Sequence, residues 1–182
     1  MRILRLLKEL DVSALDPVQR VLLVTDGTLT EILEAIFLEP VELVKIGQKN
    51  VPVDASHAAL DPEAGETIIE RKIVLRGGQS GTQYVYAESV IAADRLSPAF
   101  RKGLLESDLP VGRLWIEHKL ETFKEFLEVR FGADADLPAD FTCDRSSVFV
   151  RKYRVFSGGR PIMLITEHFP GTFNERPDIL PK

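Results

Sequence analysis

The sequence predicts an α+β domain built on an antiparallel sheet. Helical patterns gather near the start of the chain, whereas two hairpins with glycine-rich turns come later, at 67–92 and 147–169. Strands that are joined by short turns pair in antiparallel fashion. The regular alternation of strands and helices that is typical of doubly wound nucleotide-binding folds is missing. We therefore expect helices packed on an antiparallel sheet, in a single domain over residues 1–182.

Three helices are expected before residue 40. Apolar residues recur at helical spacing over 2–10, which predicts a short amphipathic helix. A second helix is expected over 16–24, where an Asp-Pro pair gives the start signal. Thr28 and Glu31 have the spacing of a capping box and begin a third helix, which ends at the Glu-Pro pair of 39–40.

Short runs of apolar and β-branched residues, bounded by turn residues, predict the strands. These runs cover 41–46, then 67–76 and 82–92 in the first hairpin, then 147–156 and 161–169 in the second. The five-residue turn Gly-Gly-Gln-Ser-Gly of the first hairpin lacks the lysine and the following helix of a phosphate-binding loop. We interpret its glycines as residues that close the hairpin.

The segments between these strands are less regular. Residues 50–66 and 132–146 are rich in acids and interrupted by proline, so we expect loops there. Ser97 followed by proline predicts the start of a further helix. Residues 119–131 fit a helix and a strand equally well, and the tail over 171–182 is expected to be loosely held.

Composition excludes several classes of protein. The net charge of −5 favours neither nucleic acid nor an anionic membrane as a partner. The single cysteine, Cys143, excludes an intramolecular disulfide and is typical of the reducing cytoplasm. No stretch approaches the roughly 20 apolar residues that span a bilayer. The three histidines are far apart in the sequence, so we expect no structural zinc site, and His168 is expected to be exposed.

Two charged residues interrupt apolar faces of predicted strands. Because side chains alternate along a strand, Glu167 shares a face with Met163, Ile165 and Phe169. Arg71 is placed in the same way among isoleucines and a leucine on the first hairpin. Burying an uncompensated charge costs several kcal/mol or more, so each residue needs a partner or a task.

Two interpretations of this pair stay open. Arg71 and Glu167 can bind each other as a structural salt bridge. Alternatively, the arginine holds a ligand carboxylate, and the desolvated glutamate, with a raised pKa, keeps a proton near neutral pH. Glu88 is a secondary candidate, because its semi-polar neighbours Tyr84, Tyr86 and Val90 favour a solvated acid on an edge strand.

Four motifs occur in an order that resembles a known family. They are Gly-Thr-Leu-Thr at 27–30, Glu-Arg-Lys-Ile at 70–73, Leu-Pro-Val-Gly-Arg-Leu at 109–114, and Pro-Ile-Met-Leu-Ile-Thr-Glu-His-Phe-Pro at 161–170. Together they resemble the chorismate pyruvate-lyase (4-hydroxybenzoate synthase) family, as a divergent branch. The resemblance covers residues ~20–170, which is close to the usual size of one domain.

The resemblance implies a six-stranded antiparallel sheet and a ligand cavity closed by helical flaps. It also implies conversion of chorismate to 4-hydroxybenzoate and pyruvate, without metal or organic cofactor. The arginine matching Arg71 holds the ring carboxylate, and the glutamate matching Glu167 contacts the side of the ring hydroxyl. The residues matching Val111, Gly112 and Leu29 help to wall the pocket.

One departure from the family concerns the second carboxylate of chorismate. Better-known members carry an arginine close to the position of Glu88, so this chain must hold the pyruvyl carboxylate differently. Arg76, Arg113 and Arg151 are alternatives among which the sequence does not choose.

The roles and the competing functions follow from this resemblance. Glu167 is expected either to protonate the leaving ether oxygen or to orient the 4-hydroxyl. The alternative function is a non-catalytic module that binds small aromatic acids, related to the ligand-sensing domains of GntR-type repressors. A third possibility is an inactive homologue that sequesters 4-hydroxybenzoate. The sequence leaves open whether the protein is a monomer or a small homo-oligomer.

Overall fold

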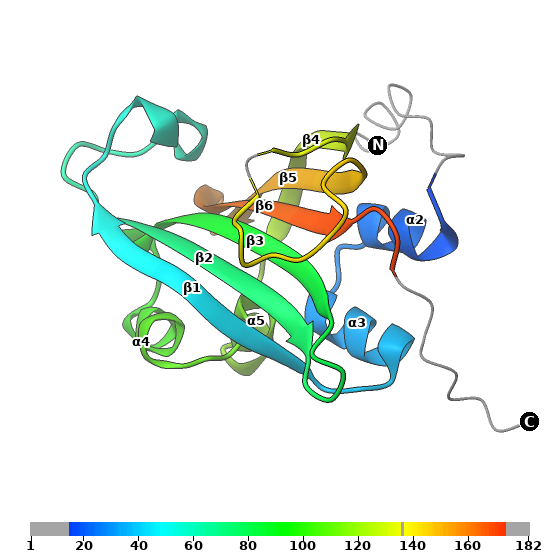
Figure 1. Ribbon diagram of the computed structural model, residues 1–182. Helices are drawn as coiled ribbons and strands as arrows, with labels where there is room; N and C mark the ends of the chain where they lie inside the picture. Colours follow the sequence, from blue (N-terminus) through cyan, green and yellow to red (C-terminus); the bar gives the residue numbers. More distant parts are fainter. Residues whose placement is uncertain (1–14, 136, 174–182) are drawn as a thin grey trace, which may run out of the picture.

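The computed structural model describes residues 15–135 and 137–173 and contains a six-stranded antiparallel sheet. The strand order is β1-β2-β3-β6-β5-β4 (Figure 1). The strands are β1 (Val41–Val51), β2 (Ile68–Gly77), β3 (Gln83–Ala92), β4 (Phe123–Gly132), β5 (Val148–Ser157) and β6 (Arg160–Pro170). The predicted fold class is confirmed, and both hairpins form at the expected positions. The helix expected over 2–10 and most of the expected tail lie outside the described residues.

Within the described residues, four α-helices accompany the sheet. They are α2 (Pro17–Val24), α3 (Leu29–Phe37), α4 (Pro98–Glu106) and α5 (Val111–Glu117). Asp16 caps α2 in a capping box with Gln19, and Ser97 caps α4. The capping box expected at Thr28 is wrong: α3 begins after Thr28, but the Thr28 side chain makes no capping hydrogen bond. Helix α5 was not predicted, because it is short and follows Pro110.

All four α-helices cover one face of the sheet. Helices α2 and α3 bury leucines against a cluster that includes Leu75 of β2. Helices α4 and α5 bury Phe100 and Leu114 against a second cluster, which includes Ile69 of β2. Side chains alternate along a strand, and Ile69 and Leu75 are an even number of positions apart, so they point to the same side of β2. The two clusters therefore lie side by side on one face, with a gap between them.

The opposite face is covered by irregular segments. Leu137 and Phe141, in the loop between β4 and β5, pack on Val74, Tyr86 and Val150. The 3₁₀-helix η2 (Ala55–Leu60), within the loop predicted over 50–66, packs Leu60 on a fourth cluster. Because the central strands are covered on both sides, they contain few exposed positions.

One local prediction is wrong, and one alternative that the sequence left open is decided. His168 is buried, not exposed, and its Nδ1 lies 2.8 Å from Oδ2 of Asp134, beneath the loop on the opposite face. Residues 123–132, which fitted helix and strand equally, form strand β4. The register of β4 on β5 shifts between Phe126 and Glu128. This irregularity inserts an extra residue, which breaks the two-residue periodicity that identifies a strand.

Candidate active site

A small cavity lies in the gap between the two apolar clusters. Its volume is about 60 Å³, and its apolar walls include Leu29, Ile73, Val111 and Ile165. The charged side chains that line it are Arg71, Lys124 and Glu167. A cavity of this size has room for a few water molecules but not for an aromatic acid. A ligand of that size can enter only if the walls separate.

Arg71 contributes a buried guanidinium without a partner. The residue is 4% exposed, and its Nε and Nη2 have no hydrogen-bond partner among the described residues. These two nitrogens form one edge of the guanidinium, the edge that binds a carboxylate with two parallel hydrogen bonds. Burial lowers the pKa of Arg71, and the charge of Asp108 offsets this in part. Arginine nevertheless stays charged in proteins, so an unsatisfied cation faces the cavity.

Glu167 is bound by two side chains of the neighbouring strand. Arg151, fully buried, donates from Nε to Oε2 of Glu167, and the Tyr153 hydroxyl donates to Oε1 over 2.9 Å. Arg151 also donates to the main-chain oxygen of Leu22 in α2. Burial, and then the nearby Glu167 charge, raise the pKa of Tyr153 well above its ordinary value. Tyr153 is therefore a neutral hydrogen-bond donor.

This arrangement decides between the two interpretations of the pair. Arg71 and Glu167 do not form the structural salt bridge that we considered, because Glu167 is engaged by Arg151. Both oxygens of Glu167 accept hydrogen bonds, one from Arg151 and one from Tyr153.

Lys124 and Trp115 also line the cavity, and neither was predicted from the sequence. The Lys124 side chain is 4% exposed, and its Nζ donates to the main-chain oxygens of Asp26 and Gly27 over 3.0 and 3.2 Å. Burial lowers the pKa of Lys124, against the opposing charge of Glu167. The Trp115 Nε1 is buried without a hydrogen-bond partner among the described residues. The broken periodicity of β4 concealed Lys124, and the unpredicted helix α5 concealed Trp115.

The wall residues implied by the family resemblance surround the same cavity. Leu29 is the first residue of α3, and Val111 and Gly112 open α5. A Cβ atom at Gly112 would lie 2.7 Å from Cγ2 of Thr28, the residue that precedes α3. Real Cβ contacts are never so short, so glycine allows the starts of the two helices to approach closely over the cavity.

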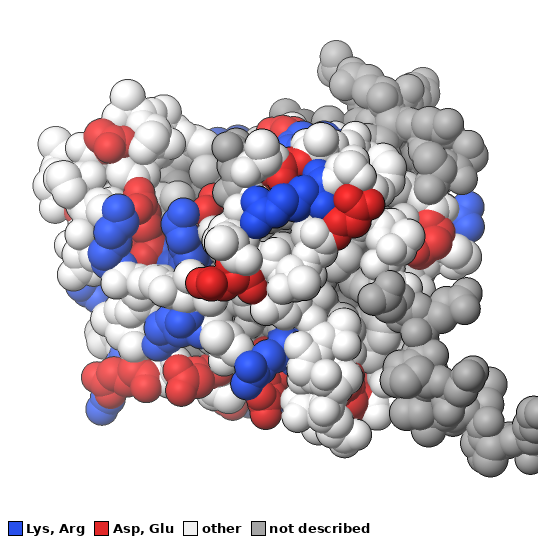
Figure 2. Space-filling model, in the orientation of Figure 1, with Lys and Arg blue, Asp and Glu red and all other residues white. Residues whose placement is uncertain are grey.

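Three other candidates lie elsewhere. Glu88 is not on an edge strand, since β3 lies between β2 and β6, and its carboxylate binds Lys72 at 2.7 Å and the Tyr86 hydroxyl. Arg113 binds Glu34 at 2.7 Å and does not line the cavity. Arg76 pairs with Glu42 at 3.3 Å, with both side chains about half exposed. Figure 2 shows acidic and basic side chains interspersed in this way over the face in view.

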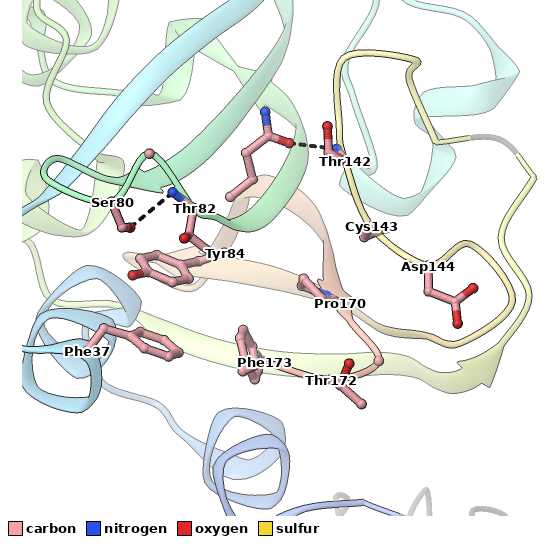
Figure 3. Close-up of a pocket in the computed structure, with 13 residues that line it drawn as sticks. Phe37, Ser80, Thr82, Tyr84, Thr142, Cys143, Asp144, Pro170, Thr172 and Phe173 are labelled. Carbon is pink, nitrogen blue, oxygen red and sulfur yellow. Dashed lines mark hydrogen bonds between the residues drawn. The ribbon is translucent and has the colours of Figure 1, made fainter. Parts of the chain in front are cut away.

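A larger cavity, of about 410 Å³, lies beside the turn between β2 and β3. Figure 3 shows Phe37, Tyr84 and Phe173 on one side of it and Cys143 and Asp144 on the loop opposite. The buried polar atoms that lack partners in the described part of the chain all belong to residues outside this cavity. Of these two cavities the smaller is thus the better candidate, because it is lined by buried donors that lack partners among the described residues.

The comparison with known families agrees with this geometry. A family model described as "Chorismate pyruvate-lyase Rv2949c-like" matches residues 23–176. The chain belongs to this family. A relative from Mycobacterium tuberculosis named chorismate pyruvate-lyase is 33% identical over 172 residues, which are 90% of this chain and 84% of the relative. The family resemblance inferred from the four motifs is therefore confirmed.

Solved structures with this fold include domains of transcription regulators. The effector domain of PhnF from Mycobacterium smegmatis aligns with a TM-score of 0.62 at 15% identity, over 81% of this chain and 91% of that domain. A GntR-family transcriptional regulator from Bacillus cereus aligns with a TM-score of 0.55 at 14% identity, over 77% and 99% of the two chains. At such low identity these likenesses show the fold alone.

Two features are absent from the described residues. No group of three or more His, Cys, Asp or Glu side chains in the described ranges is arranged to hold a metal ion. Among the helices of the described chain, none is long and apolar enough to cross a membrane.

Proposed function

We propose that this protein eliminates pyruvate from chorismate and releases 4-hydroxybenzoate, with no metal or organic cofactor, in the cytoplasm. Membership of the lyase family supports the reaction class. The observation that carries the proposal is the unsatisfied Nε and Nη2 edge of Arg71 inside an apolar cavity. A buried cation without a partner is costly, and a carboxylate bound side-on removes that cost.

The proposed pose follows the sheet register. Arg71 faces Ser89 across β2 and β3, and Ala87, two residues before Ser89, faces Glu167 across β3 and β6. The backbones of β2 and β6 are two strand spacings apart, roughly 9–10 Å. A para-substituted ring fits between the two inward side chains, with its carboxylate on Arg71 and its 4-hydroxyl on Glu167. The wall residues Leu29 and Val111 then enclose the ring.

The chemistry needs positioning more than it needs a strong acid. The C3–O bond of chorismate breaks, the C4 proton leaves, and the ring becomes aromatic. The departing enolpyruvate takes up a proton at its methylene carbon and becomes pyruvate. Of the two roles considered for Glu167, the ion pair with Arg151 favours orientation: the carboxylate accepts a hydrogen bond from the 4-hydroxyl and holds C4 in place.

The enclosed geometry has a kinetic consequence. Since the cavity is small in the absence of ligand, substrate entry and product release both require the starts of α3 and α5 to separate. Release of a buried aromatic product is therefore expected to limit turnover. A burst of product in the first turnover supports this expectation, and equal rates in first and later turnovers contradict it.

The direct test is incubation of the purified protein with chorismate. Formation of 4-hydroxybenzoate is followed by its absorbance. Pyruvate is measured separately, by its enzymatic reduction to lactate with consumption of NADH. We expect equal amounts of both products, with the rate lost in Arg71→Met and reduced in Glu167→Gln. Wild-type protein that forms neither product contradicts the proposal. Unchanged rates of pyruvate release in both variants contradict the assigned roles.

The second candidate is a binding module without catalytic activity. The fold that this chain shares with domains of transcription regulators supports this candidate. Such a module binds a small aromatic acid in the same cavity without turnover. Titration of 4-hydroxybenzoate together with the chorismate assay separates the candidates. Tight product binding without turnover identifies a binding or sequestering protein, whereas turnover identifies the lyase.

A further inference from the structure

The second carboxylate of the substrate needs its own cation, and none of the three candidate arginines is available. Arg76 and Arg113 lie outside the cavity and pair with glutamates, and Arg151 is bound to Glu167. We propose that Lys124, assisted by the indole N–H of Trp115, binds the enolpyruvyl carboxylate. This inference rests on the proposed function, because it names the group that recognises the second charge of the same substrate.

The hydrogen bonds of Lys124 leave one proton free. An ammonium group has three donors, and two of them are used by the main-chain oxygens of Asp26 and Gly27. The Asp26 carboxylate is 3.9 Å away, which is too far for a hydrogen bond, and its side chain is 72% exposed. Among the described residues, the third donor therefore has no acceptor, although the side chain is almost completely buried.

Trp115 provides a second donor in the wall of the same cavity. The Lys124 Nζ lies 5.6 Å from the centre of the Trp115 ring. The Trp115 Nε1 lacks a hydrogen-bond partner in the described structure, and both residues line the cavity that contains Arg71. A buried indole N–H usually finds a partner. A ligand carboxylate has two oxygens and can accept a hydrogen bond from each of the two donors.

The buried charges also match a dianion. The cluster consists of three cations, Arg71, Lys124 and Arg151, and one anion, Glu167. The buried members of this cluster thus carry a net charge of +2. The exposed carboxylate of Asp26, 3.9 Å from Lys124 Nζ, and the charge of Asp108 near Arg71 offset this excess only in part. Chorismate carries two carboxylates and neutralises the excess, whereas 4-hydroxybenzoate carries only one. The site is therefore expected to discriminate between ligands by their number of carboxylates.

The test uses binding and does not depend on turnover. The two probes are 4-hydroxybenzoate, a monoanion, and 3-(carboxymethoxy)-4-hydroxybenzoate, an unreactive dianion of the same ring. Titration calorimetry gives the dissociation constant of each for the wild type and for Lys124→Met. We expect the wild type to bind the dianion more tightly. Lys124→Met should weaken dianion binding about tenfold to hundredfold, as for one lost charged hydrogen bond, and change monoanion binding less than about threefold.

A purely structural role of Lys124 has a different signature. Because Lys124 also holds the 26–27 segment before α3, a structural role predicts that Lys124→Met weakens both ligands in parallel. That result, or unchanged binding of both, overturns the inference. Trp115→Phe keeps the packing and removes only the N–H donor, and it should weaken the dianion alone. This variant keeps the test decisive if Lys124→Met does not fold.

The outcomes also separate this inference from the proposed function. If the wild type converts chorismate but Lys124→Met treats the two probes alike, the lysine assignment fails and the lyase proposal stands. If the wild type shows the dianion preference through Lys124 but forms no pyruvate, the lyase proposal fails and the dicarboxylate site stands. Binding of neither probe by the wild type contradicts both.

Discussion

Arg151 and Glu167 face each other across β5 and β6 and form a buried ion pair. Arg71 lies on β2, two strands from β6 in the sheet. The Nε and Nη2 edge of its guanidinium has no hydrogen-bond partner among the described residues. The two arginines therefore have different tasks in one apolar layer. Arg151 holds Glu167 as a charged acceptor, and Arg71 remains available to a ligand. This division supports a site for an aromatic acid rather than a purely structural charge network.

Arg151→Met is expected to destabilise the fold by about 3–5 kcal/mol, because it leaves the buried Glu167 charge without its partner. Urea denaturation measures the loss. The double variant Arg151→Met/Glu167→Gln should be more stable than the single variant, since the uncompensated charge is gone. Arg76→Met is the control: its exposed pair with Glu42 is expected to contribute about 0–1 kcal/mol. Equal losses in Arg151→Met and Arg76→Met contradict a stabilising buried pair.

Arg71→Met should separate stability from binding. Because the guanidinium is buried without a partner in the described structure, we expect its removal to leave the free energy of unfolding unchanged or higher. The affinity for 4-hydroxybenzoate should fall about a hundredfold or more, through loss of two charged hydrogen bonds. Thermal melting and calorimetry measure the two effects. Strong destabilisation with intact binding points to a structural arginine.

Gly112→Ala is expected to weaken ligand binding through the contact between α5 and the start of α3. The added Cβ would lie 2.7 Å from Cγ2 of Thr28, so the helix starts must move apart. Thr28→Ser removes that methyl group, and the next Thr28 atom is 3.6 Å away, an ordinary contact. The double variant should therefore recover most of the affinity measured by calorimetry. No recovery means that glycine is required at position 112 for another reason.

Glu88→Gln is expected to leave the rate of pyruvate release within about twofold of wild type. Glu88 binds Lys72 and Tyr86 away from the cavity, at a site about two-fifths exposed. Glu167→Gln, measured in the same assay, should lower the rate at least about tenfold, as for other groups that position a reacting centre. A large effect of Glu88→Gln means that Glu88 contributes to the reaction although it lies away from the cavity.

Acid stability should depend on Glu39. Burial alone would raise the pKa of Glu39, but hydrogen bonds from Ser80, Tyr84 and the main chain outweigh it and lower the pKa to about 2, from 4.5. Because the folded-state pKa is lower than the unfolded-state pKa, ionised Glu39 stabilises the fold at pH values above about 4.5. This stabilisation is lost as the pH falls from about 4.5 towards 2. The urea midpoint of Glu39→Gln should therefore change less than that of wild type between pH 5 and pH 3. Parallel curves contradict this role.

Much of the fold followed from local patterns. The two hairpins were predicted because their runs of apolar and β-branched residues are bounded by glycine-rich turns. Arg71 and Glu167 were identified because each interrupts an apolar face, and burial confirms that both lie inside. The expectation that Glu88 lies on an edge strand was wrong, because β3 lies between β2 and β6, and alternation along one strand does not show where that strand lies in the sheet.

The remaining site residues depend on irregular or distant structure. Lys124 lines the cavity from β4, where the register shift between Phe126 and Glu128 leaves the segment without clear periodicity. Trp115 lies on a helix of seven residues, which is too short to show a helical pattern.

By itself, the sequence determined the antiparallel α+β fold, the family and the presence of two charges on apolar strand faces, because each depends on residues close together in the chain. Only the tertiary structure decided which charges pair. The partner of Glu167 comes from a different strand. Arg71 has no hydrogen-bonded acid among the described residues, although the charge of Asp108 acts on it from further away. Ion pairing in a buried layer is set by strand order and register, and these are properties of the folded chain as a whole.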